Sequence, residues 1–211
     1  MKVLRFLACM IVLPLLSFSL RSTSTSATSG KEVAQILIMG VRDNVKSNFY
    51  DEDLIAQETG IKVDSIDTRF NSIVANNIAG ASPNSSCKFI TALDGTLPSE
   101  VSKKIEVEGD GENSISHLNN LSTTAFQKTL EDAKANYLLV LNQHYLKRQE
   151  KPMRTIFHIV SYTLYDQNKK QVLSGHQYFT SMKLESSDKI KQISKKSASK
   201  IASSIAKVLN L

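Results

Sequence analysis

The chain has 211 residues, of which 41% are hydrophobic and 22% charged, and its formal net charge is +6. These values are typical of a globular domain, and they exclude a disordered protein, a collagen and a polytopic membrane protein. The two cysteines, Cys9 and Cys87, are too few for a disulfide framework or a cysteine-rich zinc site.

The first residues have the layout of a secretory signal peptide. Lys2 and Arg5 precede an apolar stretch over residues 6–20, and small polar residues follow it. The stretch is shorter than the roughly 20 residues of a membrane-spanning helix. We expect a signal peptide over residues 1–27, cleaved between 19 and 27, and therefore an exported protein of the periplasm or the extracellular space. The alternative is that the segment is retained and anchors the domain on a membrane.

The basic residues are unevenly distributed along the remaining domain, residues 28–211. Residues 31–182 carry 16 basic and 18 acidic groups, whereas residues 183–211 carry seven lysines and two acidic residues. The positive charge of the domain therefore lies in its last segment. We do not expect nucleic-acid binding, because arginine is sparse and no ribbon of aromatic and basic residues is present.

Apolar periodicity predicts the elements of the first half. Residues 34–40 form a short apolar run that is typical of a buried strand. After a polar connection, apolar residues at helical spacing predict a helix that begins at Asp67 and ends near Gly80. A second strand is expected over residues 87–92. It leads into a long exposed connection, residues 94–113, which contains a short strand near its middle.

In the second half, Ser122 is expected to cap a helix that ends at Asn136, and residues 137–141 form the third strand. Residues 155–182 predict a β-hairpin, because two apolar runs flank a short polar turn. We place Asp166 opposite Gln171.

The tail from Ser187 predicts one long amphipathic helix with isoleucines on one side and lysines on the others, capped by Ser187 or Asp188. The expected order is strand, helix, strand, helix, three strands, helix. This order indicates an α+β or mixed α/β domain, with helices packed against a single sheet of about five strands.

Catalytic signatures are missing from the sequence. It contains no glycine-rich phosphate loop, nucleophile elbow, zinc-protease helix or calcium loop. Two acidic clusters, Asp64 with Asp67 and the run Asp51–Asp53, offer paired carboxylates for acid/base chemistry. Such clusters before a helix more often cap it or offset its dipole. We expect neither a cofactor nor an enzyme.

Three histidines, His144, His158 and His176, fall on consecutive predicted strands, where a metal ion could gather ligands across a sheet. The hairpin register places His158 and His176 on opposite faces, so we expect no metal site. A thiol nucleophile formed by Cys87 and a histidine is not expected either, because Cys87 opens an apolar strand.

Two segments, residues 133–140 and 162–166, resemble a small α/β domain of bacterial envelope proteins. In that domain an alanine-rich turn precedes an Asp-Tyr strand, and a Tyr-x-Leu-x-Asp hairpin follows; here Asn136 replaces the acid. The domain is shared by the TolB N-terminal domain, the periplasmic part of the curli secretion protein and the LpoB-type activators of cell-wall synthases. The resemblance implies a cell-envelope protein that binds other proteins without a cofactor. It supplies no functional residues.

The sequence therefore predicts an exported, non-enzymatic envelope protein that serves as a protein-binding or assembly accessory domain. The expected binding surfaces are residues 94–113, residues 146–154 and the lysine face of the last helix, represented by Lys195, Lys196 and Lys200. Such a helix can also dock on an anionic membrane surface. The alternative is an enzyme or small-ligand carrier with a site assembled from dispersed residues, for which Cys87, His144 and His176 are the first suspects.

Overall fold

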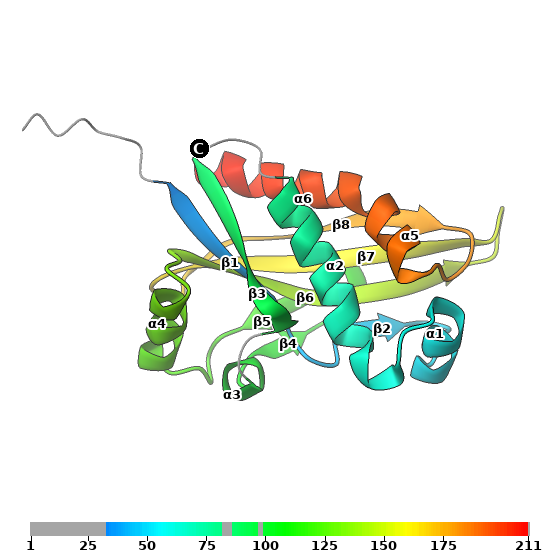
Figure 1. Cartoon of the computed structure of the whole chain (residues 1–211), viewed down its shortest axis with the longest axis horizontal. Coiled ribbons are helices and arrows are strands. Elements are labelled where there is room, and N and C mark those ends of the chain that lie inside the picture. Colours follow the sequence, from blue (N-terminus) through cyan, green and yellow to red (C-terminus); the bar gives the residue numbers. More distant parts are fainter. Residues whose placement is uncertain (1–32, 82–85, 97–98, 211) are drawn as a thin grey trace, which may run out of the picture. The chain divides into compact units, whose positions relative to one another are not determined.

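The computed structural model of the chain describes residues 33–81, 86–96 and 99–210 (Figure 1). The predicted signal peptide and its cleavage site lie outside the described residues, so the leader and the domain boundary at 28 stay predictions. All described elements belong to the contact unit that begins at residue 31.

A mixed sheet of six strands is the frame of this unit, and its main path runs β3-β1-β6-β7-β8. The central strand β1 (Ala34–Gly40) pairs in parallel with β3 (Cys87–Thr96) on one side and with β6 (Tyr137–Gln149) on the other. Alternate side chains of β1 are buried on opposite faces, which explains its unbroken apolar sequence. The short strand β2 (Val45–Ser47) continues this side by pairing with β6.

The antiparallel half of the sheet consists of β6, β7 (Thr155–Asp166) and β8 (Gln171–Ser181). The predicted hairpin register is confirmed from the pair Leu164–Leu173 to the pair Ile156–Ser181. At the turn the register shifts, so Gln171 pairs with Tyr165 instead of Asp166.

Helices cover the first face of the sheet. They are α1 (Glu52–Thr59), α2 (Ile66–Gly80), α5 (Ser187–Ile193) and α6 (Lys195–Val208), with a short 3-10 turn at Val63–Ser65. Fully buried Phe70 of α2 and Ile201 of α6 belong to one apolar core with alternate residues of the strands. Because α2 packs on β1 and β3 while α6 packs on α2 and β8, the two helices cover the sheet side by side (Figure 1).

The second face is covered only in part. The connection after β3 forms α3 (Ser99–Ser102), the ribbon of β4 (Glu106–Glu108) and β5 (Ile115–His117), a 3-10 turn at Gly111–Asn113, and α4 (Thr123–Asp132). Phe126 and Leu130 of α4 fill a second apolar core. The α+β class, with helices packed against one sheet, is thus confirmed.

Two helix ends differ from the prediction. Ser122 caps α4 by accepting a hydrogen bond from the Ala125 amide at 3.2 Å, as expected, but the helix ends at Asp132 and the left-handed residue is Lys134. Asn136 instead bonds to Gln35 of β1. Its backbone amide donates to the Gln35 carbonyl at 2.8 Å, and its side-chain oxygen accepts from the Gln35 backbone amide at 3.1 Å. It therefore joins the sheet and does not end the helix.

The predicted tail helix is two helices that meet at Ser194. The residue before the first is Ser186, which makes no side-chain cap, so neither Ser187 nor Asp188 is the N-cap. The buried hydroxyl of Ser194 donates to the Ile190 carbonyl at 2.7 Å and accepts from the Asn77 amide of α2 at 2.8 Å. Asn77, which interrupts the apolar stripe of α2, thus holds the junction of the last two helices.

Candidate functional site

The last helix presents its lysines to solvent. α6 buries small and branched residues, among them Ala198, Ile201 and Ile205, against α2 and β8. Lys195, Lys196, Lys200 and Lys207 are exposed. Within the described residues, no carboxylate lies within ion-pair distance of any of them, since the four ion pairs found there all involve other groups. The helix therefore carries positive charge that the described chain does not neutralise.

Ser204 shows which side of α6 borders β8. Its half-buried side chain is hydrogen-bonded to Tyr162 of β7. The Tyr162 hydroxyl lies over Gly175 of β8, because a Cβ added to that glycine would be 3.1 Å from the hydroxyl oxygen. Residues separated by four, seven and eleven positions share one side of a helix. Lys196, Lys200 and Lys207 therefore lie in line with one another, and at about 100° per residue they are roughly opposite buried Ile201 and Ile205, on the side of α6 that faces away from the sheet. We call these three residues the lysine stripe.

Lys195 does not belong to the lysine stripe. It precedes Lys196, and successive residues of an α-helix are about 100° apart around the axis. The three lysines that the sequence grouped together are thus divided: Lys196 and Lys200 share the outward side of α6, while Lys195 points to another side of the helix.

Strand β8 is an outer strand of the sheet. It pairs with β7 on one side, and no strand among the described residues pairs with its other side. Its sequence, Gln171–Ser181, contains neither a charged residue nor a proline, and its pairing is regular from Leu173 onward. Outer strands usually carry a lysine, a proline or a bulge that discourages further pairing. β8 lacks the first two, so it presents a long backbone edge.

The other two predicted surfaces are also exposed over most of their described residues. Parts of 94–113 pack over the sheet, with Ser102, Ile105 and Gly111 buried, and nothing is described of the side chains at 93–99. At the tip of the β6–β7 hairpin, Met153 is 67% exposed, and the Arg148 guanidinium lies 3.7 Å from the ring centre of exposed Phe49.

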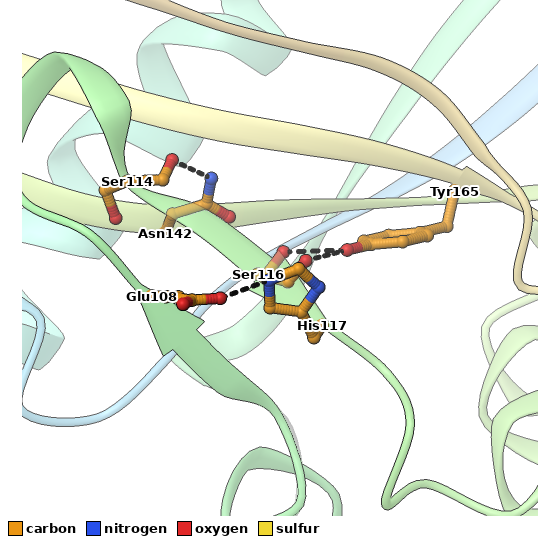
Figure 2. A network of polar contacts seen from close by, with 6 residues as sticks. All are labelled: Glu108, Ser114, Ser116, His117, Asn142 and Tyr165. Carbon is orange, nitrogen blue, oxygen red and sulfur yellow. Dashed lines mark hydrogen bonds and ion pairs between the residues drawn. The ribbon is translucent and has the colours of Figure 1, made fainter.

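A polar network joins the β4–β5 ribbon to the sheet (Figure 2). The Asn142 amide donates to the Ser114 carbonyl at 2.8 Å and to the Thr163 hydroxyl at 2.9 Å. The Tyr165 hydroxyl donates to the Ser116 carbonyl and lies 3.2 Å from the Ser116 hydroxyl. Burial raises the pKa of Tyr165, so the phenol stays protonated as a donor.

Access to this network is limited, since Ser114, Ser116, Asn142 and Thr163 are all buried. At its exposed end, Nε2 of His117 lies 3.3 Å from the Glu108 carboxylate, and together they link the two ribbon strands. These hydrogen bonds fasten the ribbon to the sheet. The network could not be predicted from the sequence, where its members are scattered polar residues in predicted strands.

Two of the suspected histidines meet inside the first apolar core. Nε2 of His144 lies 3.1 Å from Nδ1 of His158, and Nε2 of His158 lies 3.0 Å from the Ser181 hydroxyl. Phe70 and Phe179 pack against the rings. Burial lowers the pKa of His158 to about 3 and, together with repulsion from His158, lowers the pKa of His144 well below its ordinary value. Both rings are therefore neutral.

His176 lies on the other face of the sheet, as predicted, and is exposed. No group of three or more metal-ligating side chains occurs among residues 33–81, 86–96 and 99–210. Cys87 is buried at the start of β3, and burial raises the pKa of its thiol. Of the three suspected histidines, the structure therefore brings His144 and His158 together and places His176 on the other face of the sheet.

Two acidic residues near α1 and α2 accept hydrogen bonds from backbone amides. Asp51 caps α1 by accepting from the Leu54 amide at 2.8 Å, as predicted. Asp67 does not cap α2; its carboxylate accepts from the amides of Asp43 at 2.7 Å and Val45 at 3.0 Å. It fixes the loop that follows β1.

Behind that loop, the side chains of Asn44 and Asn71 exchange two hydrogen bonds, of 2.9 and 3.0 Å. Each also donates to a backbone carbonyl, Asn44 to Leu141 and Asn71 to Val41. Gly40 allows this approach, because a Cβ there would stand 2.1 Å from the Asn71 side chain.

Comparisons with known proteins yield distant structural similarities. No protein-family model matches the chain, and no curated protein matches it. The fold is similar to that of the PelC dodecamer of Paraburkholderia phytofirmans, at 11% identity, covering 80% of this chain and 86% of that one, with a TM-score of 0.38. It is also similar to lipoprotein GNA1162 of Neisseria meningitidis, at 11% identity over 84% and 99% of the two chains, with a TM-score of 0.36.

A third similarity is to the hypothetical protein CT253 of Chlamydia trachomatis, at 6% identity over 71% and 72% of the two chains, with a TM-score of 0.36. At such values nothing that these proteins do transfers to this chain, and the resemblance to TolB, curli secretion and LpoB-type domains stays a prediction. Within the part of the chain that the structure describes, no helix is long and apolar enough to cross a membrane.

Proposed function

We propose that the protein is an exported, non-enzymatic domain of the cell envelope that binds another protein through the exposed lysine side of α6. The observation that supports this proposal is the lysine stripe, which no carboxylate of the described chain neutralises. Exposed charge without an internal partner is available to another protein at little cost to the fold.

The signal-peptide layout of residues 1–27 supports the location. The buried histidine pair and the Tyr165 network support a structural role for these groups, because His144 bonds to His158 and Tyr165 bonds to Ser116 in positions that hold the strands and the ribbon together.

The proposal is tested by cross-linking in intact cells. A photoreactive residue at exposed Ser203 of α6, next to the lysine stripe on the outward side of the helix, is expected to give a discrete cross-linked protein in envelope fractions. Lys196→Glu with Lys200→Glu should reduce that product, whereas Lys128→Glu on α4 should leave it unchanged.

Two outcomes contradict the proposal. One is the absence of any protein cross-link from α6 together with an unchanged phenotype after charge reversal at Lys195, Lys196 and Lys200. The other is binding of the purified domain to vesicles that contain anionic lipid, abolished by the same charge reversals, which would assign α6 to a membrane surface instead.

A further inference from the structure

We infer that the partner of the lysine stripe is a second copy of this chain, which binds it head to tail through an acidic surface at α1. This inference rests on the proposed function and specifies its partner. The acidic surface consists of Asp51, Glu52 and Asp53 at the start of α1 and Asp64 in the 3-10 turn that follows, and all four residues are exposed. We call these four residues the acidic end.

The acidic end carries negative charge that the described chain does not neutralise. None of its carboxylates belongs to the four ion pairs found among residues 33–81, 86–96 and 99–210. Their hydrogen bonds come from uncharged groups: Asp51 accepts from the Leu54 amide, and Asp64 accepts from the Ser65 hydroxyl at 2.8 Å. The acidic end is therefore the counterpart, opposite in sign, of the lysine stripe.

The two surfaces do not neutralise each other within one copy. α1 and the 3-10 turn pack at the start of α2, whereas α6 begins near the end of α2, where Ser194 bonds to Asn77 (Figure 1). The eleven residue steps from Ile66 to Asn77 correspond to about 16 Å of helix. Charges at that separation are screened at physiological salt, where the Debye length is about 8 Å. Direct attraction between the two surfaces thus acts only between copies.

Two hollows at the acidic end can receive lysine side chains. One, of about 450 Å³, is lined by the carboxylates at the start of α1 together with Val63. The other, of about 470 Å³, is lined by Glu52, Asp64 and again Val63, which is 43% exposed. Lys46 borders the first and Lys62 the second, but carboxylates outnumber lysines in both. A lysine stem can pack on Val63 while its ammonium group reaches a carboxylate.

A second copy accounts for both charged surfaces at once. An acidic protein of another kind, or an anionic lipid, would match the lysine stripe and leave the acidic end without a counterpart. Pairing of like surfaces is disfavoured, because two lysine stripes or two acidic ends repel each other. A contact between two different surfaces leaves one of each free on a dimer, so further copies can add to form a ring or a filament.

The test is sedimentation velocity of the purified protein and of two variants that neutralise one surface each. The stripe variant is Lys196→Gln/Lys200→Gln/Lys207→Gln, and the end variant is Glu52→Gln/Asp53→Asn/Asp64→Asn. Asp51 is kept because it caps α1. The parent should associate at about 100 μM in low salt and dissociate in about 0.5 M salt, which screens the charges. In each variant alone the dissociation constant should rise about tenfold or more.

A mixture of the two variants tests the head-to-tail arrangement directly. The stripe variant retains the acidic end, and the end variant retains the lysine stripe. An equimolar mixture should therefore form a 1:1 dimer and nothing larger, whereas the parent should form larger species as its concentration rises. Lys103→Gln/Lys104→Gln/Lys128→Gln removes three exposed lysines from the connection over the second face and is the matched control. It should associate like the parent.

The inference is overturned if the parent stays monomeric at about 1 mM in low salt, if the control loses association like the stripe variant, or if the mixed variants do not pair. In each case a cross-link from Ser203 to a different protein in cells would still support the proposed function, so the two failures are distinguishable. If the end variant is unstable because α1 loses carboxylates near its positive end, Asp64→Asn alone, outside that helix, replaces it.

Discussion

The polar network under the β4–β5 ribbon and the lysine stripe on α6 are polar regions of opposite kinds. In the network, Asn142 and Tyr165 are buried and hydrogen-bonded to neighbouring elements. In the stripe, three lysines are exposed, and none forms an ion pair within the described chain. The difference separates two uses of polar residues: substitutions in buried networks should change stability, and substitutions in the stripe should change binding.

The largest loss of stability is expected at the buried asparagine pair. Asn71→Leu leaves polar atoms of Asn44 and the Val41 carbonyl without their partners, which should lower the free energy of unfolding by about 3 kcal/mol. Urea unfolding measures this value. Asn76→Leu on the exposed side of α2 is the matched control, and an equal loss in both variants would contradict the structural assignment.

Acid should destabilise the fold through the histidine pair. The pKa values of His144 and His158 are lowered in the folded state, so below about pH 6.5 the unfolded chain binds protons that the folded chain does not. Stability is complete above that pH and should fall by about 1.4 kcal/mol per pH unit for each histidine as the pH drops.

Unfolding in urea between pH 7 and pH 5 measures this slope. His158→Gln should reduce this slope by about 1.4 kcal/mol per pH unit, the contribution of one proton. A slope that is unaffected by His158→Gln would mean that other groups account for the acid sensitivity.

Within the ribbon network, two hydroxyl deletions should differ. Tyr165→Phe removes the donor to the Ser116 carbonyl and should cost about 1–2 kcal/mol of unfolding free energy. Ser114→Ala removes a buried hydroxyl that has no hydrogen-bond partner among the described residues, so it should cost less than about 0.5 kcal/mol. Equal effects in thermal unfolding would show that the network does not fasten the ribbon.

The smallest effect on stability is expected in the lysine stripe. Reversal of Lys196, Lys200 and Lys207 should change the free energy of unfolding by less than about 0.5 kcal/mol. A larger loss, measured in the same urea titration, would show that these lysines support the fold and would weaken their assignment to partner binding.

The sequence predicts the elements well where one periodicity extends over a whole element. β1, α2 and the β7–β8 hairpin follow directly from their apolar patterns, and the hairpin register is correct except at its turn. β2 and α1 were not predicted, because they lie in a polar stretch and are short, with ends held by Asp51 and Asp67 rather than by an apolar face.

The candidate site shows where sequence reasoning stops. Helical periodicity identifies the exposed lysines and separates Lys195 from the lysine stripe, but the packing of α6 on α2 and β8 is visible only in the structure. The histidine pair depends on an irregularity in β6 between Leu141 and Gln143, which moves His144 onto the face of His158. Strict alternation from Leu141 would place His144 on the opposite face.

The position of β1 also affects when the chain can fold. Its two partners lie far along the sequence: Ala34 pairs with Cys87, and Ile36 pairs with Tyr137. Parallel pairing over such separations is slow, because a long loop must close before any contact forms. The middle of the sheet therefore cannot be completed until about two thirds of the chain has been synthesised. During that time a nascent chain with a predicted export leader stays unfolded, as passage through a translocation channel requires.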